Sequence, residues 1–363
     1  MQKTLSLTFH HPRRGFQTLR LPPLPVPFNF LLGVLQCSLF SFPDRLRVLR
    51  VGYSLRTARD EQLLGGETIR EWLKRLGQSD ECIRSFWEPL AVSIMNEKIQ
   101  KASALVFVRA LRKAFLGGFR SAALAVPSVG LSKLFVDSAR DYVLLHAGSL
   151  QCHADVVGLV VEHGIAAGVK LRDNAAIRAD ALILTVPPFK LFPMVPSPLK
   201  EELSQILSID TSPIVSIHLW FHVEFMGHES IGLIGRRIQW LFNRRLINGE
   251  KGAGAHVSAV ISSAHELVDL TKDELVKMAV EDIRSVYPDL HEEPWHGVVI
   301  REKNATYSSS PATEPLRPST RTALPNVFLA GDWTATGYPA TIEGAVLSAE
   351  RAAGFAREYL MLA

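Results

Sequence analysis

The chain has 363 residues, a formal net charge of +4 and a hydrophobic fraction of 47%. This length allows about two domains with a large core. So small a charge, with no basic run interleaved with aromatic residues, argues against a nucleic-acid partner and fits an anionic membrane surface better. The three cysteines, Cys37, Cys82 and Cys152, are far apart and form no C-x-x-C pair, which predicts a reducing compartment and no metal site.

The first distinctive segment is residues 21–43, which contains no charged residue but holds Pro22, Pro23, Pro25 and Pro27 close together. The prolines exclude a continuous spanning helix, and the unbroken part, 28–42, is shorter than the roughly 20 residues that a bilayer requires. Arginines flank the segment on both sides: Arg13, Arg14, Arg20, Arg45, Arg47 and Arg50. Two interpretations stay open. The segment is either a monotopic patch that dips into one leaflet and admits a lipid substrate, or a core helix beneath a proline-rich loop.

Residues 44–145 are predicted to be mostly helical. A short helix is expected over 67–76, and Ser79 caps a second helix, which Pro89 interrupts. The helix predicted over 103–115 has apolar residues nearly all round, so we expect it to be buried.

Between residues 148 and 188 the pattern changes to that of β-strands. Strands over 156–162 and 168–171 can pair through a turn at Gly164. The apolar run 181–186 predicts a buried strand, and the two prolines that follow, Pro187 and Pro188, mark its end.

Residues 211–320 have the pattern of a second domain. Strands are predicted over 214–221, 257–262 and 297–307. The helix predicted over 271–286 begins with a threonine followed three residues later by glutamate, which is the capping-box pattern.

The most informative segment lies near the end, at residues 326–346. The apolar run 327–330 predicts a buried strand, and Gly331 and Asp332 end it with an acidic side chain. Pro339 then suits the first position of a long helix. A strand, an acidic residue, a loop and a helix N-terminus predict a ligand site at the carboxyl edge of a sheet.

The run GDWTATGYPATIEGAVLSAERAA, residues 331–353, resembles the C-terminal FAD signature of the flavin amine oxidase and phytoene desaturase superfamily. Residues 77–104 and 126–139 resemble the helical region of its squalene-associated FAD-dependent desaturases, the hydroxysqualene dehydroxylases. The resemblance implies an α/β (mixed α+β) two-domain fold like that of the amine oxidases, N-terminally truncated and with a helical insert. It divides the chain into a remnant of the FAD domain with an apolar membrane-facing patch (1–43), a helical substrate or membrane region (44–145), a β block of the FAD domain (146–190), a substrate domain (191–320) and the C-terminal FAD-binding strand and helix (321–363).

The resemblance also implies roles for single residues. Asp332, after Gly331, bonds the ribityl-pyrophosphate part of FAD, and the backbone of Val156 passes near the adenine. The residues that bring the helix N-terminus to the flavin ring are Pro339, Ala340, Thr341, Ile342 and Glu343.

No residue is identified as the catalytic acid. Lys303 is a candidate because members of the superfamily often place a lysine near the flavin N5, although a lysine at a strand edge is usually solvated. Asn96 is a candidate for contact with the substrate hydroxyl, although such a residue more often caps a helix.

The resemblance further implies an opening G-x-G-x-x-G turn, which this sequence lacks. The nearest text, residues 252–257, has no third glycine and precedes a predicted strand. The chain is then either a fragment of a longer protein or a real truncated form. In both cases we expect it to bind FAD poorly by itself, its sheet to lack its central strands, and an upstream extension to restore flavin binding.

The leading hypothesis is an FAD-dependent oxidoreductase that removes the hydroxyl group of hydroxysqualene, a long isoprenoid, in hopanoid and squalene synthesis. We expect a cytoplasmic protein, peripheral to the inner face of the membrane and associated with other enzymes of squalene synthesis. The alternatives are a carotenoid-type desaturase, a flavin amine oxidase, and a non-catalytic remnant without flavin. The uncharged segment 21–43 speaks against the amine oxidase, and the missing glycine turn favours the remnant.

Overall fold

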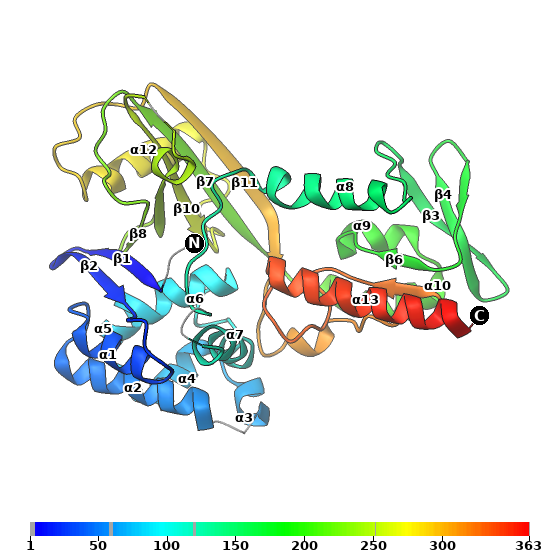
Figure 1. Ribbon diagram of the computed structural model, residues 1–363, viewed down its shortest axis with the longest axis horizontal. Coiled ribbons are helices and arrows are strands. Elements are labelled where there is room, and N and C mark those ends of the chain that lie inside the picture. The colour runs from blue at the N-terminus through cyan, green and yellow to red at the C-terminus, as the bar shows by residue number, and fades with distance from the viewer. Residues whose placement is uncertain (1–3, 58–60, 119–120, 251, 363) are drawn as a thin grey trace. The chain divides into compact units, whose positions relative to one another are not determined.

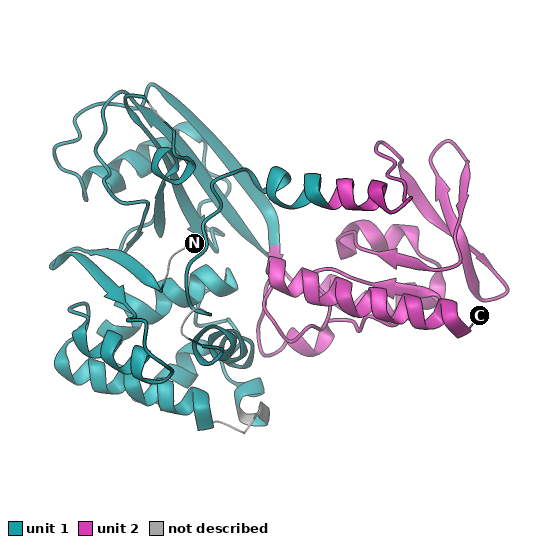
Figure 2. Ribbon diagram, viewed as in Figure 1, with its two compact units in different colours: residues 1–138, 211–305 teal, residues 139–210, 306–363 magenta. Residues whose placement is uncertain are grey.

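The structure is a computed structural model that describes residues 4–57, 61–118, 121–250 and 252–362, with the backbone alone for Glu61 and Leu63. The chain forms two compact units (Figure 2). Unit 1 is built from residues 1–138 and 211–305, and unit 2 from residues 139–210 and 306–363. Each unit is therefore assembled from two separate stretches of sequence, and the long strand β11 runs from one unit into the other (Figure 2).

Unit 1 contains a seven-stranded sheet with the order β11-β7-β10-β9-β8-β1-β2 (Figure 1). Its strands are β1 (Ser6–His11), β2 (Gly15–Arg20), β7 (Thr211–Phe221), β8 (Ser230–Leu233), β9 (Trp240–Asn243), β10 (Ala255–Ser262) and β11 (His296–Tyr307). Alternate residues of β7 and β10 are buried and pack against helix α12 (Lys272–Arg284). The predicted capping box is present, since the Thr271 hydroxyl accepts from the Glu274 N–H and the Glu274 carboxylate accepts from the Thr271 N–H.

The hairpin of β1 and β2 belongs to this sheet. Strand β1 pairs in parallel with β8, with Phe9 opposite Gly232. A Cβ added to Gly232 would lie 2.6 Å from the Phe9 ring, so the two strands meet closely only because no side chain is present there. We expected residues 1–43 to be a remnant of the FAD domain. Residues 4–43 lie in the unit of the seven-stranded sheet, and the pairing of β1 with β8 joins segments that are more than 200 residues apart in sequence.

A helical layer forms the rest of unit 1 (Figure 1). Its elements are α1 (Phe28–Gln36), α2 (Phe42–Thr57), α3 (Glu61–Gly66), α4 (Ile69–Arg75), α5 (Asp80–Cys82), the π-helix η1 (Ile83–Trp87), α6 (Glu88–Met95) and α7 (Ala104–Leu116), with α11 (Arg244–Asn248) beside β10. The core of this layer holds the fully buried rings of Trp72, Phe86, Trp87 and Phe107. The predicted cap at Ser79 is present, since its hydroxyl accepts a hydrogen bond from the Cys82 N–H. The Ser103 hydroxyl caps α7 in the same way and accepts from the Val106 N–H.

Unit 2 contains two small sheets and one long helix. The antiparallel sheet comprises β3 (Val156–Glu162), β4 (Ile165–Leu171) and β5 (Ala176–Arg178), and the parallel sheet comprises β6 (Leu182–Leu184) and β12 (Val327–Leu329). The helices are α8 (Asp137–Leu145, which begins in unit 1 after the π-helix η2, Ser132–Val136), α9 (Pro188–Leu191), α10 (Ser197–Ser204), α13 (Ile342–Leu362) and the 3-10 turns η3 (Phe192–Met194), η4 (Gln205–Ser208) and η5 (Glu314–Leu316).

The predicted β3–β4 hairpin forms through the turn at Gly164, where φ is +81°. The strand predicted over 181–186 is shorter than expected, since β6 covers only Leu182–Leu184. It is also less buried than expected, since its central residue Ile183 is 41% exposed. The parallel sheet has two strands among the described residues. Parallel sheets usually have more strands, and both of their faces are covered by other elements.

Candidate functional site

The candidate site is the connection between β12 and α13 in unit 2. Strand β12 is fully buried and pairs in parallel with β6, so its carboxyl end delivers Gly331 and Asp332 to the edge of the sheet. Asn326, just before the strand, has no exposed surface. Its side-chain amide donates to the carbonyls of Ala166 and Asp180 and accepts from the Ala166 N–H, which ties the start of β12 to the antiparallel sheet.

Gly331 takes a backbone conformation that other residues rarely adopt, with φ at +143°. Its N–H donates to the hydroxyl of Ser348 on α13 at 2.7 Å. A Cβ added at this position would lie 2.3 Å from Nε1 of the buried Trp333 indole. Gly331 therefore lets the chain turn sharply between the strand and the indole, and Ser348 fixes that turn to the helix.

A buried arginine holds the loop that follows. The Arg317 side chain has no exposed surface, and its guanidinium lies over the Tyr307 ring, 4.5 Å from the centroid. It donates to the Glu314 carboxylate, to the carbonyl oxygens of Asp332, Thr334 and Tyr338, and to the Thr336 hydroxyl. A planar guanidinium can satisfy several carbonyl groups at once, so Arg317 sets the path of residues 332–338.

Helix α13 begins at Ile342, not at Pro339 as we predicted. The Thr341 hydroxyl accepts from the Gly344 N–H and donates to the Pro339 carbonyl, so Thr341 acts as the N-cap. A Cβ on Gly344 would lie 2.9 Å from the Pro339 carbonyl oxygen. Pro339, Ala340 and Thr341 thus form the lead-in to the helix, while Ile342 and Glu343 are exposed in its first turn.

The Asp332 carboxyl is half-buried. Burial raises its pKa, and this effect exceeds the opposing influence of the Arg317 guanidinium and of the N–H groups of Asp332 and Trp333. Val156, the other predicted contact of the cofactor, is half-buried at the start of β3 in the antiparallel sheet of the same unit. Asp332 thus lies at the end of a buried strand, where burial makes its carboxyl group harder to ionise than a carboxyl group in water.

The roles of Arg317, Ser348 and Asn326 were not predicted from the sequence. Arg317 and Asn326 act mainly on main-chain groups, and such contacts leave no mark in the sequence. Ser348 had a signal: Gly344, Ser348, Ala352 and Ala356 recur every four residues and form the buried stripe of α13.

Asn96 lies in unit 1 and has a structural setting. It ends α6 in a left-handed conformation with φ at +47°. Its side-chain amide donates to the Ser212 carbonyl at 3.0 Å and accepts from the Ser263 N–H at 2.7 Å. The buried amide therefore joins the end of α6 to strand β7 and to the residue that follows β10.

Replacing Asn96 by alanine is expected to lower the free energy of unfolding by about 2–4 kcal/mol, because two buried main-chain groups lose their partner. The matched control is Asn174→Ala, since Asn174 is also left-handed, with φ at +67°, but is exposed in a turn. For Asn174→Ala we expect the free energy of unfolding to fall by only about 1 kcal/mol. Urea denaturation measures both. Lost activity with unchanged stability in the Asn96 variant would instead support contact with the substrate.

Lys303 lies on β11 and is 65% exposed. Its ammonium group pairs with the Asp269 carboxylate at 2.8 Å, and that carboxylate is 80% exposed. Exposed pairs of this kind contribute little to stability because water screens them.

We expect Lys303→Gln to leave the urea midpoint unchanged, and Asp269→Asn to behave in the same way. Any loss of activity in the lysine variant can then be attributed to chemistry and not to unfolding. A clear drop in the midpoint of either variant would contradict this description of the pair.

A group of imidazole and indole rings covers part of the outer face of the sheet in unit 1. The rings of Trp220 and His256 stack with centroids 4.2 Å apart. The His218 ring and the Ser258 hydroxyl form a hydrogen bond. Burial, with a smaller effect of His218, lowers the pKa of His256 to about 4, and Arg244 acts in the same direction while Glu250 opposes it. Burial also lowers the pKa of His218.

This arrangement predicts a loss of stability in acid. A histidine whose pKa is lower in the folded than in the unfolded state binds its proton first in the unfolded state, so stability falls as the pH drops from about 6.5 towards about 4. Urea midpoints measured across that range should fall less steeply for His256→Gln than for the wild type. Equal slopes would show that His256 is not responsible.

Among the described residues, no group of three or more histidine, cysteine, aspartate or glutamate side chains could hold a metal ion. In the same residues, no helix combines the length and apolar character needed to cross a bilayer.

Solved structures show which known fold this chain shares. An oxidoreductase from Methanosarcina mazei has a TM-score of 0.72 at 16% identity, and an engineered variant of putrescine oxidase has a TM-score of 0.70 at 15% identity. Each comparison covers 98% of this chain and 81% of the other. The predicted mixed α/β fold of the flavin amine oxidases is confirmed.

The sequence matches the family of flavin containing amine oxidoreductases over residues 3–354, and the chain belongs to that family. The family uses FAD. Hydroxysqualene dehydroxylase of Zymomonas mobilis is 28% identical over 287 residues, and that of Sinorhizobium fredii is 29% identical over 276 residues. Each match covers 75% of this chain and 62% of the relative, so the chain spans less than two thirds of the length of these relatives. The 15-cis-phytoene desaturase of Solanum lycopersicum is 21% identical and covers 90% of this chain.

Proposed function

We propose that this chain is the larger part of an FAD-dependent oxidoreductase that reductively removes the hydroxyl group of hydroxysqualene to give squalene. The observation that carries the proposal is the fixed connection between β12 and α13, which belongs to a chain whose similar relatives include hydroxysqualene dehydroxylases. A desaturation of a carotenoid-type isoprenoid is the second candidate, since the desaturase relative matches a larger share of this chain.

The residues of unit 2 fit a flavin dinucleotide. Gly344 lets the Pro339 carbonyl pack directly against the first turn of α13, and the neighbouring residues Ile342 and Glu343 leave that turn exposed to a ligand. The half-buried carboxyl of Asp332 can accept hydrogen bonds from hydroxyl groups. We assign the ribityl-pyrophosphate part to Gly331 and Asp332, the adenine to the backbone of Val156, and the flavin ring to residues 339–343.

The chemistry that FAD supplies when it is bound and reduced is hydride donation, with the hydroxyl leaving as water after protonation. The contribution of this chain is positional. Arg317 and Ser348 hold the loop and the helix start in one conformation before any ligand binds, which reduces the ordering cost of binding. We further propose that the protein works at the inner face of the membrane, where its substrate dissolves, and contacts other enzymes of squalene synthesis there.

Two measurements test the proposal. With hydroxysqualene, FAD and a flavin reductant, the purified protein should form squalene, detected by mass spectrometry. Dehydrogenation of phytoene in a parallel assay that supplies FAD and a quinone as electron acceptor, without squalene formation in the first assay, would favour the desaturase. In a titration followed by flavin fluorescence, Asp332→Ala should bind FAD at least about tenfold more weakly than the wild type. Glu350→Gln, an exposed change on the same helix, should bind as the wild type does. Equal affinities of the Asp332 variant and the wild type would contradict the assigned site.

A further inference from the structure

An apolar cavity of about 310 Å³ lies in unit 1 between α1, α2 and α7. It is lined by the side chains of Val26, Phe30, Leu31, Leu49, Phe115 and Leu116, with Gly52 on one wall. A Cβ on Gly52 would lie 2.9 Å from the Phe30 ring, so the glycine brings α2 close to that ring. The lining is almost entirely carbon, which suits a hydrocarbon chain and not a polar ligand.

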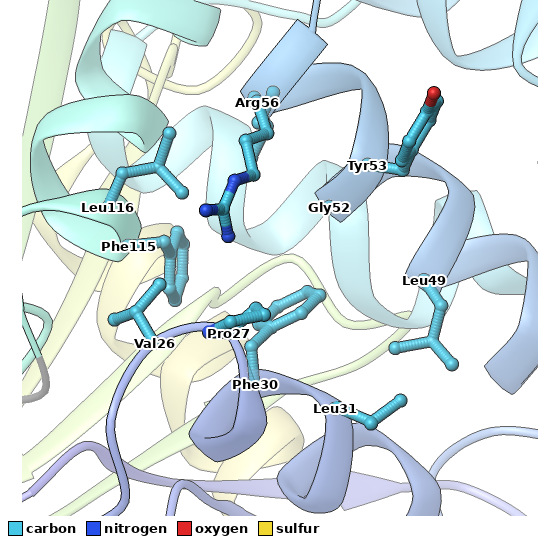
Figure 3. A pocket seen from close by; sticks show the side chains of 11 residues that line it. Val26, Pro27, Phe30, Leu31, Leu49, Gly52, Tyr53, Arg56, Phe115 and Leu116 are labelled. Carbon is cyan, nitrogen blue, oxygen red and sulfur yellow. The ribbon is translucent and has the colours of Figure 1, made fainter.

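One cationic side chain, that of the exposed residue Arg56, lines this cavity. Figure 3 shows the Arg56 guanidinium pointing towards the rings of Phe30 and Phe115, while the Tyr53 hydroxyl points away. Within the part of the chain that the structure describes, Arg56 makes no hydrogen bond or ion pair. An apolar cavity lined by one exposed, unpaired guanidinium fits an amphiphile whose single chain lies among the apolar side chains and whose anionic headgroup pairs with the arginine.

The surface around the cavity is apolar and basic. On α2, Phe42, Leu46, Leu49 and Tyr53 follow one another at helical spacing, and Phe42 and Tyr53 are 67% and 70% exposed. On α1, Phe28 is 60% exposed, while the opposite residues Asn29, Gly33 and Val34 are buried. Thus the segment predicted to be either a membrane patch or a core helix has one buried face and one exposed apolar face.

The charges of this surface favour an anionic partner. Over residues 28–57 there are four arginines and one acidic residue, Asp44. The Asp44 carboxylate is buried and already bonded to Ser41, Ser79 and Arg47. Within residues 28–57, exposed aromatic and aliphatic side chains accompany arginines and no carboxylate is exposed. This is the composition of a surface that binds anionic lipid headgroups.

We propose that the cavity takes one acyl chain of an anionic phospholipid, whose headgroup pairs with Arg56, so that the α1–α2 surface docks on the membrane. This inference rests on the membrane location proposed above and not on the proposed redox chemistry. The cavity is a lipid anchor that positions the protein at the bilayer.

The test uses two probes. Lysophosphatidylglycerol below its critical micelle concentration reports chain uptake, and flotation with vesicles of phosphatidylcholine, alone or mixed with phosphatidylglycerol, reports docking. We expect a one-to-one complex with the lysolipid, vesicle binding that requires phosphatidylglycerol, and weaker vesicle binding at high salt. Leu116→Trp, which fills the cavity, and Arg56→Gln should each weaken lysolipid binding at least about tenfold.

Leu246→Trp is the matched control, since Leu246 is 48% exposed on α11 and does not line the cavity. It should bind as the wild type does. Arg56 is exposed, so its variant will fold even where the tryptophan variant does not. Equal lysolipid binding by the wild type and both cavity variants would overturn the proposal, and so would tighter binding of free oleate than of the lysolipid. Intact lipid binding without squalene formation would refute the redox function alone.

Discussion

Replacing Arg317 by methionine is expected to lower the free energy of unfolding by about 3–5 kcal/mol and to loosen the loop over 332–338. The substitution leaves the partly buried Glu314 carboxylate without its partner and removes the donor from three carbonyl groups. Removing one member of a buried ion pair has a cost of this size because the remaining charge stays away from water. Arg317→Lys should recover only part of the loss, since an ammonium group cannot reach the same set of acceptors.

The matched control is Arg321→Met in the same unit. Arg321 also lies over an aromatic ring, that of Phe355, and also pairs with a carboxylate, that of Glu358, but both partners of the ion pair are 59% exposed. We expect a loss below about 1 kcal/mol there. Guanidinium denaturation measures stability, and hydrogen exchange of the loop amides measures local order. If both arginine variants lost the same stability with no faster exchange in the loop, Arg317 would have no special role in the site.

The sequence was sufficient where a local pattern determines the structure. The serine and threonine caps and the alternating strands β7 and β10 are decided by neighbours within a few residues, and these predictions are confirmed. The start of α13 was predicted three residues early, because two signals competed. Pro339 suits the first position of a helix. The Thr341 hydroxyl, however, accepts a hydrogen bond from the Gly344 N–H and so caps the helix, which therefore begins after Thr341.

The remaining features depend on contacts between distant segments. Phe9 meets Gly232, and Asn326 bonds to Ala166, across separations that no local pattern encodes. For the candidate site, sequence reasoning located the acidic residue and the helix that follows it. It could not find Arg317, whose partners are mostly carbonyl groups that every residue has. The residues that hold a site in place are therefore harder to predict from sequence than the residues that carry its polar side chains.

Gly331→Ala is expected to destabilise the protein to a degree similar to Arg317→Met. The left-handed conformation costs an alanine roughly 1–3 kcal/mol, and forcing its Cβ against a packed core costs a similar amount, so we expect a loss of about 3 kcal/mol or more. The atom that must move is in the Trp333 indole, which is only 5% exposed, so neither the ring nor the backbone can shift freely. Urea denaturation of the variant measures the loss.

Two further variants separate these causes. Gly354→Ala changes an exposed glycine within α13, where no atom lies within 4 Å of the added Cβ, and should stabilise the protein by about 1 kcal/mol. Adding Trp333→Ala to Gly331→Ala should remove the steric part, so the double variant should lose less than the sum of the two single losses, by about 0.5–3 kcal/mol. Strict additivity would mean that the indole does not restrict this position, and the turn would then depend on the backbone conformation and on Ser348.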